Sequence, residues 1–600
     1  MTEIPEMTET DLIDPSAQSA ARDERPPEVP PGTVWLHVKY GAGMIWRYIK
    51  AEPVIGVFLI AYQFAQSTVT VAVLLKMQLG FAAIVSALAA RNGTEIPGIV
   101  TEILLYSAGM AILNMVGVWT RLALRIRMRK VLTTRLLDSW MQDNRYFHLE
   151  QRAQIDYPEQ RIQEDIFTFV EKVTLIGVSV VASVFGVFLY TSQLWRLSPP
   201  LVFPSVGMTE PVPGLLVYVA FTLAIVMTVL VHWVGRLLTR AEVVRQRLEA
   251  QFRLEMQAIR GNGESIAFAR AGALERKRLA NTFDLIRVNW RAYTLANMRI
   301  TIVTGLPETF MFLFPYLICI PFVLDGRMQV GDIQIVMGSF TAVYMGISAI
   351  VTQYAELAIL RSAVARLQLF EDLLSVPMDS GITVRDSADR SVEVNGLRVS
   401  YPNGQPMVEL DELKITPGSR LLVQGGSGAG KSTLLRSIAG LWPYGKGDVE
   451  LPGNAKVAFL PQRNYMPDGT LAALMSYPDD PDSRGDAEYV QLLEALGLAR
   501  LAPQLHSYMP WSRILSPGEQ QRIAAARAIL AHPDFLFVDE ATSALDAGSE
   551  EQLYKALVER LPNAAIISVA HRQSVAAYHD RRLLIENGVA EVSPLQGQPS

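Results

Sequence analysis

Six long apolar stretches constrain the fold of this chain more than any other feature of its sequence. Each is close to the length that a helix needs to cross the hydrocarbon core of a bilayer, which takes roughly 20 residues. Buried helices of soluble proteins rarely stay uncharged over such a length, and only the fifth stretch holds an ionisable carboxylate, Glu308. We therefore expect an integral membrane protein. Its spans are predicted at 54–75, 103–120, 173–195, 213–231, 300–324 and 333–351.

The distribution of Lys and Arg predicts the orientation of these spans. Basic side chains concentrate at 121–161 and 236–299, whereas the alternate loops hold few. Loops rich in Lys and Arg stay in the cytoplasm, so both termini are expected there. The acidic, Pro-rich residues 1–31 lack the apolar core of a signal peptide and are predicted to form a disordered cytoplasmic tail. The mild net charge of −5 gives no indication of a nucleic-acid partner.

The composition changes after the sixth span. The membrane domain is expected to cover 32–376, with an interfacial helix at 34–50 before the first span and an ordered, Pro-rich external loop at 197–213. Residues 377–390, rich in Asp and Ser, are predicted to be a linker. From 391 to 600, short apolar strands alternate with helical segments, which is typical of an α/β domain.

A glycine-rich segment of the α/β domain has the spacing of a phosphate-binding loop, or P-loop. An apolar run precedes it and a helical segment follows, as a P-loop requires. Glycines let backbone N–H groups turn toward phosphate oxygens, the Lys adds positive charge, and the Ser hydroxyl can bind Mg²⁺. We therefore predict that this segment binds ATP together with Mg²⁺. Its residues are Gly425, Gly426, Ser427, Gly428, Ala429, Gly430, Lys431, Ser432 and Thr433.

Two adjacent carboxylates follow the apolar strand predicted at 535–538. A carboxylate at a strand end beside a P-loop can hold Mg²⁺ directly or through water, and this role is assigned to Asp539. Glu540 is next along the chain and is expected to polarise an attacking water. A solvent-exposed acidic pair without a function is the alternative, and the upstream P-loop argues against it.

The ordered motifs from about 391 to 588 resemble those of the ATPase domains of ABC transporters. By this resemblance, Tyr401 stacks on adenine, and Gln462 contacts Mg²⁺ and the attacking water. His571 resembles the switch histidine that contacts the γ-phosphate, and residues 543–546 resemble the loop that follows the catalytic glutamate. The resemblance thus implies catalytic roles for Glu540, His571 and Gln462, and a metal site formed by Ser432, Gln462 and Asp539.

Residues 515–522 resemble the signature motif of that family, in which Ser516, Gly518 and Glu519 would serve the site of a second copy. The family commonly has Gly where this chain has Pro517, and Gln where it has Glu519. Pro517 has no N–H, so its amide cannot contact a phosphate. In that family the signature of one ATPase domain completes the P-loop site of another. A chain with one ATPase domain and six spans therefore implies a homodimer.

The membrane segment resembles the exporter-type fold of ABC half-transporters. Residues 155–165, 263–268 and 314–332 further resemble the SbmA/BacA-like proteins and their peroxisomal relatives. This resemblance implies a bacterial inner-membrane protein that takes up bulky hydrophilic solutes such as peptides or cobalamin. Polar groups at membrane depth are costly unless they face water or one another, so Glu308 is the candidate for the substrate path.

Two alternatives remain open at this point. One keeps the ATPase and reverses the direction, with export of lipids, acyl-CoA-like compounds or drugs. The other is a membrane sensor that uses ATP binding as a conformational switch without transport. The presence of both Glu540 and His571 argues against the sensor, because a switch does not need groups for hydrolysis.

Overall fold

The computed structural model describes residues 33–152, 158–203, 208–376, 381–387, 389–462, 464–570 and 572–595. The chain forms two compact units, with Ser375 at the end of the first and Val376 at the start of the second. The short segment Glu150–Arg152 belongs to the second unit. The predicted tail at 1–31 lies outside the described residues.

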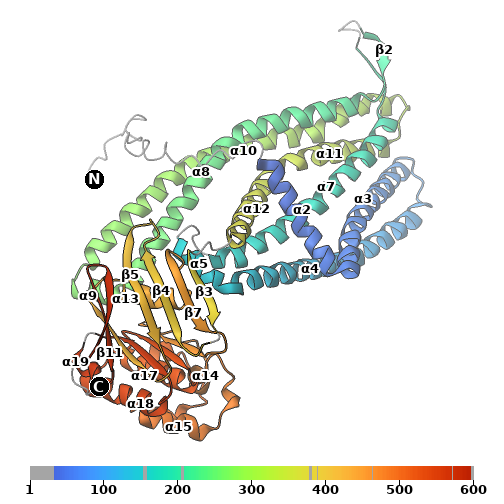
Figure 1. Ribbon diagram of the computed structural model, residues 1–600. Coiled ribbons are helices and arrows are strands. Elements are labelled where there is room, and N and C mark those ends of the chain that lie inside the picture. The colour runs from blue at the N-terminus through green and yellow to red at the C-terminus, as the bar shows by residue number, and fades with distance from the viewer. Residues whose placement is uncertain are drawn as a thin grey trace, which may run out of the picture. The chain divides into compact units, whose positions relative to one another are not determined.

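The first unit is built from long helices (Figure 1). In the described part of the chain, five helices are long and apolar enough to cross a membrane. They contain the first three and the last of the predicted spans and, from Leu215 onward, the fourth. The fifth predicted span lies in α10, where Leu313–Leu324 forms a shorter apolar helical segment. The helices are α2 (Thr33–Ala51), α3 (Pro53–Ala89), α4 (Ile96–Met141), α5 (Arg145–Arg152), α7 (Ile166–Leu197), α8 (Leu215–Gly261), α9 (Gly263–Phe268), α10 (Gly272–Leu324), α11 (Val330–Thr352) and α12 (Tyr354–Ser375).

The outer surface of this unit is apolar where the spans were predicted. On α4, the side chains of Leu105, Ile112 and Trp119 are exposed although they are large and hydrophobic. Such a surface is unfavourable in water and matches the hydrocarbon of a bilayer. Some polar groups inside the unit find partners: the buried Gln63 of α3 donates to the carbonyl of Gly117 at 3.0 Å.

Two helices extend well beyond the predicted spans. Helix α8 has 47 residues and α10 has 53, and the short α9 joins them into an antiparallel pair (Figure 1). Thr282 donates to the Glu255 carboxylate at 2.9 Å, and the Asn289 amide donates to the carbonyl of Ala241 at 3.0 Å. These bonds join the two helices at two points about two turns apart along α10.

The segment between α7 and α8 holds two short strands. Residues Leu201–Phe203 (β1) and Met208–Val212 (β2) pair as antiparallel strands, and residues 204–207 lie outside the described part. The segment expected to be an ordered loop at 197–213 thus contains a two-stranded ribbon, across which backbone N–H and C=O groups pair.

The second unit contains a ten-stranded sheet with the order β3-β7-β4-β5-β12-β11-β6-β10-β9-β8. Strands β11, β6, β10, β9 and β8 are parallel to one another, and β9 and β10 are buried without alternation because both of their faces are covered. Strands β7, β4 and β5 are antiparallel. The bounds are β3 (Ile382–Ser387), β4 (Val392–Ser400), β5 (Pro406–Ile415), β6 (Arg420–Gly425), β7 (Gly445–Pro452), β8 (Val457–Leu460), β9 (Phe535–Asp539), β10 (Ala565–Val569), β11 (Arg581–Glu586) and β12 (Val589–Pro594).

Helices cover this sheet and position the candidate site. A cluster of buried apolar side chains from the helices packs against strands β8 to β10. A second cluster lies between α13 and the strands β4, β5 and β6. The principal helices are α13 (Lys431–Ile438), α14 (Leu471–Ser476), α15 (Asp486–Ala495), α17 (Pro517–Leu530) and α18 (Ala547–Arg560).

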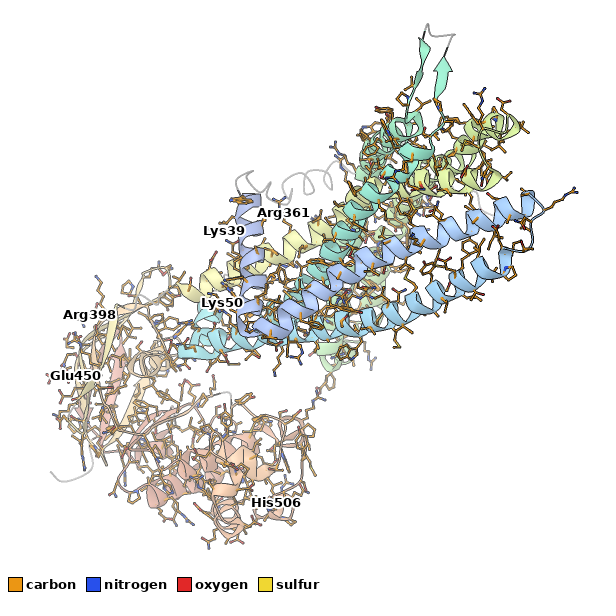
Figure 2. The ribbon with its side chains drawn as sticks, turned by 90° about the vertical axis from the view of Figure 1, so that its right-hand side faces the viewer. Lys39, Lys50, Arg361, Arg398, Glu450 and His506 are labelled. Atoms are coloured by element: carbon orange, nitrogen blue, oxygen red, sulfur yellow. The ribbon has the colours of Figure 1, made fainter. Side chains whose placement is uncertain are left out.

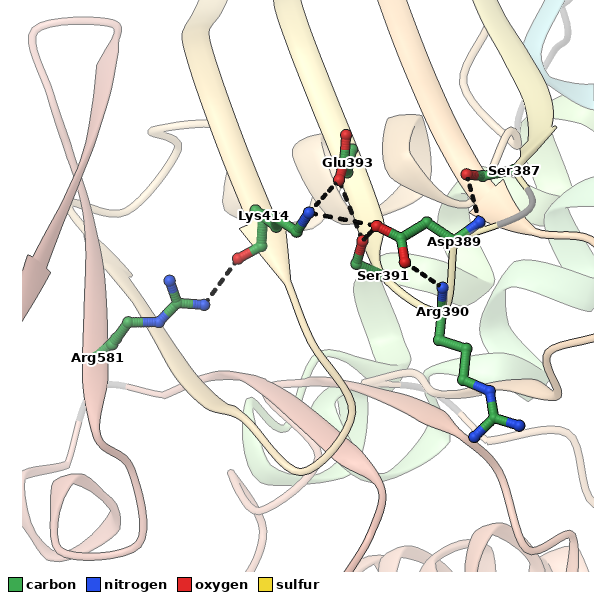
Figure 3. Close-up of polar contacts among 7 residues, drawn as sticks. All are labelled: Ser387, Asp389, Arg390, Ser391, Glu393, Lys414 and Arg581. Carbon is green, nitrogen blue, oxygen red and sulfur yellow. Dashed lines mark hydrogen bonds and ion pairs between the residues drawn. The ribbon is translucent and has the colours of Figure 1, made fainter.

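A polar cluster ties β4 and β5 together at one end of the sheet (Figure 3). The Lys414 ammonium lies 2.6 Å from the Glu393 carboxylate and 3.3 Å from that of Asp389. A hydrogen bond from Ser391, together with those from Arg390 and Lys414, lowers the pKa of Asp389, and Lys414 lowers the pKa of Glu393. Because these groups are open to solvent, the cluster orients the strand ends and adds little to stability.

Candidate functional site

The P-loop connects β6 to α13, in the order predicted from the sequence. Gly428 and Gly430 have φ values of +78° and +89°, in the left-handed region that favours glycine. A Cβ at Gly430 would lie 2.6 Å from a methyl carbon of Val408, so a side chain there would clash as well. The loop thus needs these glycines to bring its backbone around to the start of α13, where N–H groups and the helix dipole favour an anion.

Lys431 is the first residue of α13 and only 5% exposed. Its ammonium donates to the carbonyls of Gly425 at 3.0 Å and Gly426 at 2.9 Å. These bonds hold the positive charge within the loop rather than in solvent. The ammonium can therefore reach a phosphate bound by the same loop.

Ser432 and Asp539 meet although they lie far apart in the sequence. The Ser432 hydroxyl donates to the Asp539 carboxylate at 2.7 Å. The part of the chain that the structure describes holds no group of three or more His, Cys, Asp or Glu side chains that could bind a metal. A site with one carboxylate and one hydroxyl still fits Mg²⁺, because this ion keeps several waters and takes the remaining ligands from phosphates. It does not fit a metal that depends on an all-protein cage.

Gln462 and Glu540 form the second contact of the site. The Gln462 amide donates to the Glu540 carboxylate at 3.3 Å. Both residues follow the carboxyl ends of neighbouring parallel strands, β8 and β9, and these ends lie at one edge of the sheet. Glu540 itself has a φ of +47°, and its N–H donates to the carbonyl of Val569 at the end of β10. This turn places its carboxylate beside Gln462.

His571 follows β10, whose last residue is Val569, but lies outside the described residues. Tyr401 follows β4 and is 41% exposed. Its N–H donates to the carbonyl of Gln405, just before β5, and the Met407 and Val408 side chains of β5 pack against Gly430. The hairpin that carries Tyr401 therefore borders the P-loop, with the tyrosine ring accessible to a ligand.

The signature segment begins α17. Ser516 is the N-cap residue, and Pro517 occupies the first helical position, where a missing N–H costs no intrahelical bond. The departure from the common motif is thus compatible with the helix. Ser516 is exposed and Gly518 is partly exposed, as a surface that meets a second copy requires.

Glu519 differs from the expectation that its carboxylate would be offered to a second copy. It is buried and accepts hydrogen bonds from the Ser516 N–H and hydroxyl, both at 2.9 Å, and from Arg500. Burial alone would raise the pKa of Glu519, but the bonds from Arg500 and Ser516 outweigh it and lower this pKa. The carboxylate therefore completes a capping box within its own domain.

Sequence reasoning missed Glu550, which is only 2% exposed in α18. Its carboxylate accepts from the Thr542 hydroxyl at 2.7 Å and the Ser574 hydroxyl at 2.9 Å, and lies 3.6 Å from the Arg572 guanidinium. It joins the segment after β9 to the segment after β10. Its only sequence signal is a position in the first turn of a helix, which many surface glutamates share.

Glu308 lies within α10, and its side chain is outside the part that the structure describes. Its expected place on a substrate path therefore stays a prediction. The other predicted site residues form two contacting pairs and one separate surface. Ser432 meets Asp539, Gln462 meets Glu540, and the signature residues form a separate surface at the start of α17.

A P-loop at the carboxyl end of one of several parallel strands, joined in one chain to helices able to cross a membrane, defines the class of ATP-driven membrane proteins. Residues 51–324 match the family described as ABC transporter transmembrane region 2, and residues 409–543 match the ABC transporter family. An ABC transporter ATP-binding protein of Synechocystis sp. is 32% identical over 497 residues, which cover 80% of this chain and 72% of that protein.

Two further relatives extend this similarity. The inner membrane ABC transporter ATP-binding protein YddA of Escherichia coli is 29% identical over 462 residues, covering 76% of this chain and 81% of that protein. The human lysosomal cobalamin transporter ABCD4 is 29% identical over 508 residues, covering 78% of this chain and 81% of that protein. The chain belongs to the ABC transporter family. It is a half-transporter with one membrane region and one ATPase domain, and it couples ATP hydrolysis to transport.

Proposed function

We propose that this chain is a homodimeric ATP-driven importer of hydrophilic solutes in a bacterial inner membrane. The observation that supports a hydrophilic cargo best is the similarity to the lysosomal cobalamin transporter over 81% of its length. The resemblance of residues 155–165, 263–268 and 314–332 to SbmA/BacA-like proteins favours the same cargo class, with peptides as the second candidate. Similarity to the inner membrane protein YddA supports the location.

The proposed chemistry assigns a role to each group of the site. The loop 425–433 holds the phosphates of ATP, and Tyr401 stacks on the adenine. Ser432, Asp539 and Gln462 would hold Mg²⁺, which when bound would neutralise charge on the phosphates. Glu540 accepts a proton from the attacking water, and the 3.3 Å contact with the Gln462 amide orients its carboxylate for this step.

His571 is proposed to contact the γ-phosphate from the neighbouring strand end.

The proposed homodimer follows from the separation of the P-loop and signature surfaces. ABC half-transporters generally dimerise and bind ATP. Ser516 and Gly518 stand at the exposed start of α17, and a second copy would bring its own pair to the phosphates of the first. Each chain would thereby complete the site of the other, with two ATP sites for each dimer.

The proposed topology puts both termini and the ATPase domain in the cytoplasm, because the basic segments 121–161 and 236–299 lie on that side. The proposed domains are a tail at 1–31, a membrane domain at 32–376 and an ATPase domain at 391–600. The linker expected at 377–390 is shorter than predicted, because Ile382–Ser387 forms β3 and pairs with β7 in the ten-stranded sheet. Glu308 is proposed to face the path of the solute.

Transport by vesicles whose ATPase domains face outward tests both the direction and the cargo. The vesicles are loaded with labelled cobalamin or a hydrophilic peptide, while in separate samples an amphiphilic lipid analogue is supplied outside, and ATP with Mg²⁺ is added outside in every case. An importer in this orientation empties the lumen of cobalamin or peptide. The Glu540→Gln variant should bind ATP without emptying it, whereas Glu551→Gln, an exposed charge-matched control on α18, should behave as wild type.

Other outcomes would contradict the proposal. ATP-dependent movement of the amphiphile into the lumen identifies an exporter. ATP binding without turnover or movement of any solute identifies a sensor. Full hydrolysis by Glu540→Gln would refute the role given to Glu540.

A further inference from the structure

A groove of about 540 Å³ lies between α2 and α4 in the first unit. We call it the basic groove. Its cationic side chains are Arg47 of α2 and Lys130 and Arg135 of α4, and its anionic ones are Glu52 and Asp138. The remaining lining residues are Ala51, Val131, Thr134, Ser139 and Gln142.

Two of these charges are already neutralised within the unit. The Arg47 guanidinium contacts both oxygens of the Glu371 carboxylate, at 2.7 and 2.8 Å. The Glu52 carboxylate pairs with Arg127 at 3.1 Å. These pairs hold α2 against α12 and the start of α3 against α4. They form the walls of the basic groove and leave its other charges to meet a ligand.

Lys130 and Arg135 are exposed and form no ion pair within the described part of the chain. Asp138 is the one further charge of the groove, and it also lacks an ion pair there. Two cations and one anion leave the groove net positive by one. The surrounding α4 segment adds to the positive potential, because residues 121–142 contain six basic side chains and one acidic side chain, Asp138.

The position of the groove along α4 places it at the membrane surface. The Glu52–Arg127 pair marks the boundary, because Glu52 lies two residues before the first predicted span and the exposed apolar side chains of α4 continue past the second predicted span to Ile126. Lys130 and Arg135 follow Arg127 by three and eight residues, or about 4.5 and 12 Å along the helix. The headgroup layer of one leaflet is roughly 5–8 Å thick. Lys130 thus lies at headgroup depth, and Arg135 reaches it from the cytoplasmic side.

One face of α4 runs from the membrane into the basic groove and changes from apolar to polar along its length. Leu122, Ile126, Lys130 and Thr134 follow one another at intervals of four on α4, so they lie along one face of the helix. Leu122 and Ile126 are exposed, and Lys130 and Thr134 line the groove. This face offers contact for acyl chains first and for a charged headgroup next.

Helix α2 lies on the other side of the basic groove. Trp46 is 57% exposed, and the Lys50 ammonium lies 5.9 Å from the centre of its ring. Trp and Lys side chains in this arrangement are typical of the membrane–water interface. Figure 2 shows Lys39 and Lys50 toward the two ends of this helix.

We propose that the basic groove binds the phosphate-bearing headgroup of an anionic phospholipid from the cytoplasmic leaflet. The Lys130 ammonium and the Arg135 guanidinium bond the phosphate oxygens, and the exposed apolar side chains of α4 contact the acyl chains. This assignment rests on the topology proposed above. It does not rest on the cargo or on the direction of transport.

Lipid binding to the full-length protein tests the proposal. Detergent-solubilised protein is mixed with phosphatidylglycerol, phosphatidylcholine or glycerol 3-phosphate, and the bound molecules are counted by native mass spectrometry. Wild type should prefer phosphatidylglycerol. In Lys130→Gln/Arg135→Gln this preference should fall about ten-fold, because each basic group near a lipid headgroup contributes a substantial share of the attraction.

The matched control is Arg253→Gln/Lys277→Gln, which removes two exposed basic groups from α8 and α10 outside the groove. It should keep the wild-type preference. An equal loss in this control, or an unchanged preference in the groove variant, would overturn the assignment to this groove. Glycerol 3-phosphate that binds as tightly as the lipid would show a soluble phosphate ligand and would overturn the assignment to phospholipid.

Oligomeric state and ATP hydrolysis are measured on the same preparations. A groove variant that becomes monomeric without losing lipid would show that a second copy occupies the groove, which contradicts the proposal. Because lipid counting needs no ATP turnover, a protein that fails to transport can still bind the lipid. Failure of the two proposals is therefore distinguishable.

Discussion

Glu550 provides the sharpest test of how the site is assembled. Its buried carboxylate accepts hydrogen bonds from Thr542, two residues after Glu540, and from Ser574, three residues after His571. Replacing Glu550 with Ala removes both bonds and leaves Arg572 without this carboxylate. The perturbation therefore loosens the segments that carry two proposed catalytic groups, without touching the P-loop.

The magnitude follows from the number and kind of bonds lost. A hydrogen bond to a charged partner contributes about 1.5–3 kcal/mol to stability. The two hydroxyls can turn toward other acceptors, so we expect Glu550→Ala to lower the free energy of unfolding of the second unit by about 3 kcal/mol. Glu550→Gln keeps the shape and can bond both hydroxyls, one as acceptor and one as donor. Its loss should be about 1 kcal/mol.

The catalytic effect should exceed the effect on ATP binding. Misplacing a reacting group by about 1 Å can cost roughly a hundredfold in rate, so Glu550→Ala should lower kcat by about ten- to a hundredfold. KM for ATP should change little, because Lys431 and the glycines keep their contacts. Steady-state ATP hydrolysis by full-length protein in lipid nanodiscs measures both, with Glu551→Ala as the exposed control. Retention of kcat within about twofold, or a loss confined to KM, would refute the reasoning.

Three further predictions concern the same unit. Lys431→Ala should abolish most ATP affinity, because it removes the only positive side chain of the loop; titration with a fluorescent nucleotide checks this, and wild-type affinity would contradict it. Gly430→Ala should lower the unfolding temperature and weaken ATP binding together, because a Cβ there meets Val408 at 2.6 Å and the φ of +89° is strained for alanine. An unchanged unfolding temperature would show that the loop can shift freely. His579 is buried, and its ring accepts from the Ser568 hydroxyl while Nδ1 bonds the Val575 carbonyl, so burial holds its pKa below the ordinary 6.5. The stabilisation by neutral His579 is complete above pH 6.5 and is lost as the pH falls below it. The unfolding temperature should therefore decrease more steeply with acidification in wild type than in His579→Gln, and identical dependences of the unfolding temperature on pH would contradict this.

Much of the architecture could be predicted because its signals are local. Apolar length predicts membrane helices, and the spacing of the glycines predicts the P-loop. The Ser432–Asp539 contact joins residues 107 apart, yet it could be anticipated because a strand end beside a P-loop is a common place for a carboxylate. The corresponding contact between Gln462 and Glu540 follows from parallel strands ending at one edge.

Other contacts depend on tertiary packing and have no local signal. Arg500 reaches Glu519 from a separate segment, and nothing in the signature motif predicts this partner. The buried Asp165 lies within a short π-helix, Arg161–Asp165, and pairs with Arg366 of α12 across 201 residues of sequence. An aspartate and an arginine so far apart read as ordinary surface charges until the fold brings them together.

The paired helices α8 and α10 have a mechanical consequence. At 1.5 Å per residue, the 53 residues of α10 form a rod about 80 Å long. Tilting such a rod by about ten degrees moves its far end by about 14 Å. The bonds from Thr282 and Asn289 fasten α10 to α8 at two points about two turns apart, so these parts of the two helices move together. A small rotation at one end of α10 is thus enough to displace its other end by more than the thickness of a helix, which is roughly 10 Å.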